Sequence, residues 1–182
     1  INLIIINCIL LFINTENNHL EFSIFLTGQI IILISFSLFN FPHAKIFMGD
    51  SGSYLFGSLI ALNTIYTNNL NPNLSSYFFC IILFYYFFEV LFSFFRKTYQ
   101  KKSPVLPDNM HLHMICYRKI YQYFGSRNSN YVNSIIINLA FSIVIIPSIF
   151  FADNSLICKY WFFSLILIYL LIYFRLYHLT KN

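Results

Sequence analysis

The stretch SSYFFCIILFYYFFEVLFSFF, residues 75–95, carries a single charged residue, Glu89, among aromatic and aliphatic side chains. Its length matches the roughly 20 apolar residues that a helix needs to cross the hydrocarbon core of a bilayer. Two basic residues, Arg96 and Lys97, follow directly. The stretch therefore predicts a membrane-spanning helix that ends at a basic surface.

The composition of the whole chain indicates the same class of protein. Hydrophobic residues make up 58% of the 182 positions, aromatic residues 21% and charged residues only 9%. A soluble domain carries about 25% charged residues, so the composition excludes an ordinary soluble protein. A chain this apolar needs a bilayer as its solvent.

Other apolar stretches of similar length divide the chain into helices. We expect an all-α, polytopic integral membrane protein with about five complete transmembrane helices and one partial N-terminal helix. The opening stretch, Ile1–Ile13, is too short to cross alone and begins with Ile rather than Met. We therefore expect one membrane domain over residues 1–182, forming the C-terminal part of a longer protein. The complete helices are expected over Leu20–Phe39, Ser51–Thr67, Ser75–Phe95, Tyr131–Phe151 and Ile157–Leu176.

The distribution of basic residues predicts the orientation in the membrane. Seven of the eleven Lys and Arg residues lie between Arg96 and Arg127, so the positive-inside rule places the loop over residues 96–130 in the cytoplasm. Alternation of the spans then places Lys45, Arg175 and Lys181 on the same side. The net charge of +5 thus reflects membrane orientation, and nucleic-acid binding is not indicated. The segments expected outside are Asn14–Glu21, Asn68–Ser75 and Ala152–Ser155.

The segment KIFMGDSGSYLFGS, residues 45–58, places Asp50 between two glycines at the cytoplasmic start of an expected span. One interpretation is a helix N-cap, since Asp before Ser-Gly-Ser is a good helix start. The other is a magnesium–phosphate site, because Gly49 and Gly52 permit close approach of a ligand and a helix N-terminus favours anions. The residues themselves leave both interpretations open.

The basic loop contains the segment KKSPVLPDNMHLHMICYRK, residues 101–119. His111 and His113 point the same way on an extended segment but to opposite sides of a helix. With basic neighbours such as Arg118 they are suited to holding a phosphate group. One alternative is a basic loop attracted to anionic lipid headgroups. Another is a zinc site that adds Cys116, although the spacing fits no common pattern and supplies only three ligands.

Glu89 is an acid within a predicted span, which makes it a candidate for a functional role. Seven residues separate it from Arg96, so both lie on one face of a helix. The structural alternatives are a hydrogen bond between helices or an ion pair with a basic residue near the loop.

Three parts of the chain together resemble the second half of a known family. They are FNFPHAKIFMGDSGSYLFG (residues 39–57), the acid at Glu89, and RKTYQKKSPVLPDNMHLH (residues 96–113). The family is that of the polyprenyl-phosphate N-acetylhexosamine-1-phosphate transferases, glycosyltransferase family 4. These are bacterial membrane enzymes that begin envelope polysaccharides, and the resemblance is closest to the members that transfer N-acetylglucosamine-1-phosphate from UDP-N-acetylglucosamine to undecaprenyl phosphate.

The resemblance implies a reaction and a set of site residues. A polyprenyl phosphate oxygen would attack the sugar-bearing phosphorus of a UDP-N-acetylhexosamine, and UMP would leave. Asp50, His111 and His113 would be catalytic, with Asp50 as the ligand of magnesium, or of manganese in its place. The resemblance further implies the bacterial inner membrane as the location and a homodimer as a potential assembly. The expected substrate-binding residues are Gly49, Ser51, Gly52, Ser53, Asp108, His111, His113 and Arg118, with Glu89 as a further candidate.

The chain departs from the family pattern in three respects. Met114 stands where the related H-I-H-H motif has its last histidine, and Glu89 stands where the intramembrane acid is usually Asp. The paired aspartates and the Asn-x-x-Asp motif of the family are not found in Ile1–Leu38. We therefore expect this chain alone to be inactive. The alternatives are a catalytically inactive membrane fragment and a small ion-coupled transporter that uses Asp50 and Glu89.

Overall fold

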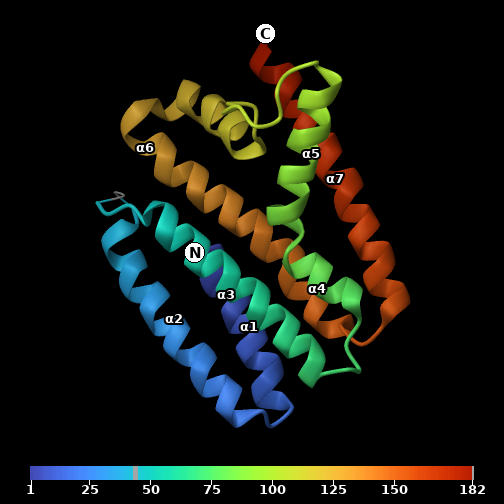
Figure 1. The fold of residues 1–182 in the computed structure, drawn as a ribbon. Coiled ribbons are helices and arrows are strands. Elements are labelled where there is room, and N and C mark those ends of the chain that lie inside the picture. Colours follow the sequence, from blue (N-terminus) through green and yellow to red (C-terminus); the bar gives the residue numbers. More distant parts are fainter. Residues whose placement is uncertain (43–44, 182) are drawn as a thin grey trace.

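The computed structural model describes residues 1–42 and 45–181, and all regular elements among these residues are helices (Figure 1). His43 and Ala44, part of the stretch that resembles the transferase family, lie outside the described residues. The all-α prediction is confirmed for the described part of the chain. The helices are α1 (Asn2–Glu16), α2 (Leu20–Asn40), α3 (Gly49–Leu70), α4 (Ser76–Ile82), α5 (Phe84–Tyr99), α6 (Leu112–Ile145), the 3-10 helix η1 (Ile146–Phe151) and α7 (Ser155–Lys181).

Three helical segments are long and apolar enough to cross a membrane: Leu20–Asn40, Asn128–Phe151 and Ser155–Thr180. They correspond to three of the five complete spans that hydropathy predicts. Their outer faces carry many exposed large apolar side chains, such as Ile24 on α2 and Leu171 on α7. These side chains suit contact with lipid tails and support a membrane protein.

The apolar stretch of residues 75–95 is not one straight helix. It divides into α4 and α5, which are bent by 75° relative to each other at Leu83 and together pass as one span. The bend directs the aromatic rings of α5 along α7. Phe88 lies 5.0 Å from Tyr169 and Phe92 lies 4.6 Å from Tyr173, measured between ring centroids. Aromatic pairs at these distances stabilise the packing of α5 against α7.

The remaining predicted span, Ser51–Thr67, falls within α3, which is helical but not apolar enough to count as a span. The expected five complete spans are therefore not all found in the described residues, which contain three, or four with the bent pair. The physical reason is that α3 buries a polar face. Asn63, Thr64 and Thr67 are buried against neighbouring helices, while apolar residues face outward.

Hydrogen bonds between amide side chains join α1, α2 and α3 along this polar face. The Nδ2 of Asn63 donates to Gln29 Oε1 at 2.8 Å and lies 3.1 Å from Asn7 Oδ1. One helical turn further along, Asn14 Nδ2 donates to Thr67 Oγ1 at 3.0 Å. Interhelical hydrogen bonds of this kind stabilise helix association in a bilayer. The polar residues of α3 thus serve to hold the first three helices together.

The segments predicted to lie outside meet at one end of the bundle. Asn14 contacts Thr67, as above, and the Ser75 N–H donates to the Ala152 carbonyl at 2.8 Å. At the opposite end, the chain's C-terminal helix meets the basic segment, where Lys119 Nζ donates to Leu179 O at 3.4 Å. Figure 1 shows the same division, with the α5–α6 connection and the C-terminus at the top. The α3–α4 and η1–α7 connections thus lie at one end of the bundle, and the basic segment lies at the other.

The stretch over residues 96–130, expected as a loop, is helical from Leu112 onwards. The helix α6 is interrupted at Gly125, whose backbone has φ 68° and ψ −178°. Glycine adopts this positive φ without steric penalty, so the chain turns sharply there. A short helix over residues 112–124 therefore precedes the apolar part of α6, which is long enough to span a membrane. The two parts are tied by Asn133, whose Nδ2 donates to His113 O at 3.1 Å.

The amide network predicts the effect of substituting its central residue. Asn63→Ala should lower the free energy of unfolding by about 1–2 kcal/mol, because Gln29 and Asn7 lose their partner inside the bundle. Asn69→Ala, at an exposed position of the same helix, should change it by less than about 0.5 kcal/mol. Reversible unfolding in mixed detergent micelles measures both values. Equal effects of the two substitutions would contradict a stabilising role of the network.

Candidate functional site

The buried carboxylate of Glu89 lies at the centre of a hydrogen-bonded group drawn from three helices. Its Oε1 lies 2.9 Å from His111 Nδ1 and accepts a hydrogen bond from the Leu112 N–H, also at 2.9 Å. Its Oε2 accepts a hydrogen bond from the Tyr169 hydroxyl. The side chain of Glu89 is 9% exposed and that of His111 is 29% exposed. The acid is therefore shielded, while the histidine reaches the surface.

These contacts explain why an acid is stable at this position. The Leu112 N–H belongs to the first turn of α6, where no intrahelical acceptor exists, and Glu89 satisfies it. A carboxylate accepts hydrogen bonds, and two of the three contacts, the Leu112 N–H and the Tyr169 hydroxyl, place a donor against it. Of the alternatives for Glu89, the hydrogen bond between helices is the one observed. Arg96, on the same face of α5, instead pairs with Asp108.

The two histidines lie side by side at the start of α6. His111 precedes the helix with an extended backbone (φ −67°, ψ 149°), while His113 is the second residue of the helix. Their rings are stacked with centroids 5.7 Å apart and planes 12° from parallel. The extended conformation of His111 thus brings both rings to one side, although His113 itself is helical. Tyr85 Oη lies 3.4 Å from His113 Nδ1.

The surroundings of His113 favour its neutral form. Partial burial beside Tyr85 lowers the pKa of His113 below the ordinary value of 6.5, and Glu89 opposes this shift, while the neighbouring His111 adds to it. A lowered pKa means that the folded protein binds a proton here less readily than the unfolded chain. The neutral imidazole, with one donor and one acceptor nitrogen, is thus favoured at His113.

Asp108 and Arg96 form an ion pair across the base of the loop. Asp108 Oδ1 also accepts a hydrogen bond from the Met110 N–H at 3.0 Å. Burial alone would raise the pKa of the Asp108 carboxyl, but the hydrogen bond and charge of Arg96 and the Met110 N–H together hold it below its ordinary value. Arg118 secures the other side of the loop by donating to Asn109 O at 2.7 Å. Asp108 and Arg118 therefore both shape the segment that precedes His111.

A basic cavity of about 330 Å³ lies against this ion pair. Lys97 is buried in its wall and donates to Pro104 O at 3.1 Å and to Leu106 O. No carboxylate lies within ion-pair distance of Lys97 among the described residues. The cavity therefore carries a net positive charge, which suits an anionic ligand such as a phosphate group. Its lining consists of Arg96, Lys97, Lys102, Ser103, Leu106, Pro107, Asp108 and Asn109.

Asp50 lies on the first turn of α3, and its side chain is exposed. The N-cap of this helix is Met48, so the N-cap interpretation of Asp50 is not supported. Gly49 adopts φ +68°, a conformation that L side chains rarely take. A Cβ on Gly52 would lie 2.6 Å from Met48 Cγ, so this glycine makes room for the methionine side chain. Backbone conformation thus explains the glycine at position 49, and packing against Met48 explains the glycine at position 52.

The remaining polar groups of this turn do not engage Asp50. Ser53 Oγ donates to the Gly49 carbonyl at 2.8 Å, and no hydrogen bond or ion pair joins Asp50 to any described residue. A free, solvent-facing carboxylate fits magnesium, which takes one or two protein carboxylates and fills its other positions with water and phosphate oxygens. Ser51, also exposed, lies next to it.

The structure does not gather the predicted site residues into one metal centre. No group of three or more His, Cys, Asp or Glu side chains is placed to hold a metal ion within the described ranges. The zinc alternative with Cys116 is therefore not supported. Nor does any hydrogen bond or ion pair connect the first turn of α3 with the histidines among the residues described. The predicted residues form two groups, one at Asp50 and one at Glu89, His111 and His113.

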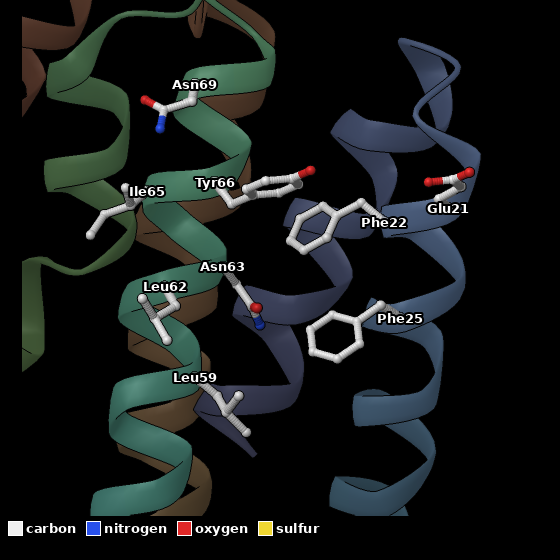
Figure 2. A pocket seen from close by; sticks show the side chains of 9 residues that line it. All are labelled: Glu21, Phe22, Phe25, Leu59, Leu62, Asn63, Ile65, Tyr66 and Asn69. Atoms are coloured by element: carbon white, nitrogen blue, oxygen red, sulfur yellow. The ribbon is translucent and has the colours of Figure 1, made fainter.

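Two further hollows lie between the N-terminal helices. A cavity of about 360 Å³ adjoins Met48, next to the Asp50 turn, and is also lined by Tyr131 and Ser134 of α6. A groove of about 460 Å³ lies between α2 and α3. Figure 2 shows Phe22 reaching across it to Tyr66, with Phe25 below, facing Asn63. The groove lies toward the end where Glu21 follows the α1–α2 turn, away from the basic loop, and is not part of the candidate site.

Four residues that contact Glu89, His113 or Met110 have no sequence pattern that would identify them individually. Tyr85 and Asn133 contact His113, Tyr169 contacts Glu89, and Tyr173 donates to Met110 O at 2.9 Å. The tyrosines of α7 recur at four-residue spacing, which places them on one face of a helix. That spacing is the one sequence feature that could have identified them.

Comparisons with known proteins give a partial match. Residues 1–68 match the model of Glycosyl transferase family 4. The chain is 34% identical over 88 residues to the undecaprenyl-phosphate alpha-N-acetylglucosaminyl 1-phosphate transferase of Thermotoga maritima. It is 35% identical over 86 residues to the decaprenyl-phosphate N-acetylglucosaminephosphotransferases of Mycolicibacterium smegmatis and Mycobacterium tuberculosis. The resemblance drawn from the sequence motifs is thereby confirmed as a partial family match.

The matched regions are limited in extent. They cover 48% of this chain and 29% of the Thermotoga protein, and 41% of this chain and 21% of each mycobacterial protein. The chain thus spans less than a third of the length of these relatives. The residues that match the family model include Asp50 and end before Glu89, His111 and His113. No solved structure matches the chain.

The environment of His113 predicts its titration. Because its pKa is lowered in the folded protein, protonation favours the unfolded chain, and this contribution to stability is lost as pH falls from 6.5 through the lower folded value. The ¹⁵N resonances of His113 in the detergent-solubilised protein should therefore titrate with a midpoint below 6.5. A midpoint for His113 at or above 6.5 would contradict the desolvated environment.

Proposed function

We propose, from the partial match to Glycosyl transferase family 4, that this chain is part of a membrane phosphoglycosyl transferase. The enzyme would move N-acetylhexosamine-1-phosphate from a UDP-sugar to polyprenyl phosphate and release UMP. The observation that carries the proposal is Asp50, an exposed carboxylate that engages no described partner and lies within the matched residues. A carboxylate held free on a rigid helix end is available to a charged ligand.

The reaction makes modest demands on protein groups. Phosphoryl transfer depends on positioning and on neutralising the charge of the phosphates rather than on covalent chemistry by the enzyme. A magnesium ion, or manganese in its place, held at Asp50 would supply charge neutralisation at the diphosphate. The N–H groups at the start of α3, around Gly49, Ser51, Gly52 and Ser53, add partial positive charge beside it.

The histidine group would hold the nucleotide end of the donor. His111 and His113 present two stacked rings at the surface, and the basic cavity beside Asp108 lies at the other end of the same loop. Neutral imidazoles donate or accept hydrogen bonds, and Arg and Lys side chains attract phosphate. Arg118, which is exposed and secures the loop, is placed to add a further positive charge.

The lipid acceptor fits the position of the site relative to the membrane. Polyprenyl phosphate is anchored in the bilayer, while a UDP-sugar is dissolved in water, so both meet only at the membrane surface. We assign the site to the cytoplasmic face of the bacterial inner membrane, where the enzyme would begin an envelope polysaccharide and could associate as a homodimer. The basic residues of the α5–α6 region support this assignment.

The rival functions are less well supported. In an ion-coupled transporter Glu89 would bind an ion, but here its oxygens are occupied by His111, Leu112 and Tyr169. A catalytically inactive fragment agrees with the small number of carboxylates at Asp50. Expressed alone, the 182-residue chain should insert into membranes and transfer no sugar phosphate.

The orientation can be tested by labelling single cysteines in a variant without native cysteines. Asn73→Cys, at an exposed position in the connection between α3 and α4, should react with a membrane-impermeant maleimide added outside intact cells. Lys102→Cys, in the basic loop, should react only after the cells are opened, because the positive-inside rule places it in the cytoplasm. Labelling of Lys102→Cys in intact cells would reverse the orientation and exclude a cytoplasmic site.

The role of Asp50 can be tested in a transferase that carries this chain as its C-terminal part. Asp50→Asn removes the negative charge at nearly constant volume, so transfer from UDP-N-acetylhexosamine to polyprenyl phosphate should fall by at least about 100-fold, equivalent to roughly 2.7 kcal/mol. Asp153→Asn, an exposed acid at the opposite end of the bundle, is the matched control and should retain activity. Membrane insertion should be unchanged in both. Activity within a few-fold of wild type for Asp50→Asn in excess magnesium would refute the proposal.

A further inference from the structure

Two tyrosines of the membrane helix α7 contact groups that adjoin His111. Tyr169 contacts Glu89, and Tyr173 contacts Met110. Tyr169 and Tyr173 lie one helical turn apart, with ring centroids 6.2 Å apart and planes 14° from parallel. Their side chains are buried, at 5% and 1% exposure. A tyrosine buried this deeply usually directs its hydroxyl to a specific partner. Each of these two hydroxyls has one in the vicinity of His111.

The partners lie on either side of the histidine. Tyr169 donates to Oε2 of Glu89, whose other oxygen, Oε1, contacts His111 Nδ1 and the Leu112 N–H. Tyr173 donates to the carbonyl of Met110, the residue directly before His111, at 2.9 Å. The side chain and the backbone of His111 are therefore both held, through one intermediate group each, by α7.

The tyrosines are themselves fixed by the aromatic rings of α5. Phe88 packs edge-on against Tyr169 at 5.0 Å, and Phe92 packs against Tyr169 at 5.5 Å and Tyr173 at 4.6 Å. Because Glu89 lies between Phe88 and Phe92 in α5, the same helix supplies the carboxylate and the rings that set the hydroxyl. A rotation of Tyr169 away from Glu89 would have to displace these rings.

The consequence for His111 concerns its tautomer. The Leu112 N–H and the Tyr169 O–H donate to Glu89, which identifies its carboxyl as the acceptor in this group. An acceptor at 2.9 Å from Nδ1 selects the imidazole tautomer that carries its proton on Nδ1. The other ring nitrogen, Nε2, is then left as a hydrogen-bond acceptor on the partly exposed edge of the ring.

We propose that Tyr169 and Tyr173 are positioning residues, which act through Glu89 and the Met110 carbonyl to hold His111 as the Nδ1–H tautomer with Nε2 free to accept a proton or hydrogen bond from a bound ligand. For the transferase reaction this inference rests on the proposed function. The chemistry that Nε2 would recognise is a donor group, such as a sugar hydroxyl or amide, or a protonated phosphate oxygen. Helix α7 thereby sets the chemistry of a group at the membrane surface.

The tautomer can be measured directly in the wild-type chain. Protein labelled with ¹⁵N-histidine is reconstituted in lipid nanodiscs, and the His111 resonances are assigned by their loss in His111→Gln. Above the pH at which the histidines titrate, His111 should show one protonated Nδ1 and one unprotonated Nε2. A predominant Nε2–H form in wild type would overturn the proposal without any need for a variant at α7.

Tyr169→Phe removes one hydroxyl and leaves the ring in place. The ratio of the Nε2–H to the Nδ1–H tautomer of His111 should rise severalfold, because the carboxylate of Glu89 loses the donor that fixes its orientation toward Nδ1. Glu89→Gln should change the tautomer in the same direction, since the amide can present a donor to Nδ1. Tyr160→Phe, an exposed tyrosine on the same helix, is the control and should leave the ratio unchanged. An unchanged ratio in Tyr169→Phe would overturn the role of Tyr169.

Tyr173→Phe tests the backbone contact separately. Loss of the hydroxyl should increase hydrogen exchange of the Leu112 amide severalfold, because the Met110 carbonyl is released and the start of α6 is held by Glu89 alone. Exchange equal to that of Tyr160→Phe would remove Tyr173 from the proposal. Trp161 fluorescence reports in each variant whether α7 remains folded, and the wild-type measurement decides the tautomer of His111 independently of any variant.

The spectroscopic and catalytic outcomes are separable. If a transferase carrying this chain is active, Tyr169→Phe should reduce turnover in parallel with the tautomer change, while Tyr160→Phe should not. If transfer is absent in wild type but the tautomer responds as expected, the proposed function fails and the positioning of His111 stands. If transfer is present and the tautomer does not respond to Tyr169→Phe, the proposed function stands and the positioning role of Tyr169 fails.

Discussion

The buried carboxylate of Glu89 is the constraint on which the arrangement at the membrane surface depends. An ionised group inside an apolar bundle is stable only if donors replace the water that it has lost. Here the donors come from His111, from the first turn of α6 and from Tyr169 of α7. Satisfying one acid thus requires three helices to meet at one point. The position of the histidine ring is a consequence of that requirement.

The first three helices meet the same requirement with neutral groups. Asn63 of α3 bonds Gln29 of α2 and contacts Asn7 of α1, so amides replace water where the helices cross. Each half of the chain therefore has a polar centre within an apolar exterior. The difference is one of charge. The amide network needs only complementary partners, whereas the carboxylate also selects the protonation of the histidine beside it.

Asp50 shows the opposite arrangement of an acid. It lies in the matched part of the chain, on an exposed helix end, and no described group neutralises it. Because water solvates it, the carboxylate needs no partner from the protein and stays available to a cation. Glu89 holds helices together and Asp50 is free for a ligand. The burial of Glu89 suits a positioning role, and the exposure of Asp50 suits a binding role.

Hydropathy and charge in the sequence alone determined that the protein is helical and membrane-spanning, with spans near Leu20–Asn40, Asn128–Phe151 and Ser155–Thr180. They did so because a bilayer imposes length and polarity locally, residue by residue. The bend at Leu83, the polar face of α3 and the turn at Gly125 depend on which helices become neighbours, and they came only from the tertiary structure. The motifs identified His111, His113 and Asp50 as candidates. The sequence did not predict the contact of Glu89 with His111, 22 positions away, or that of Tyr169 with Glu89, 80 positions away. Hydrogen bonds over such separations are set by helix packing and leave no local pattern.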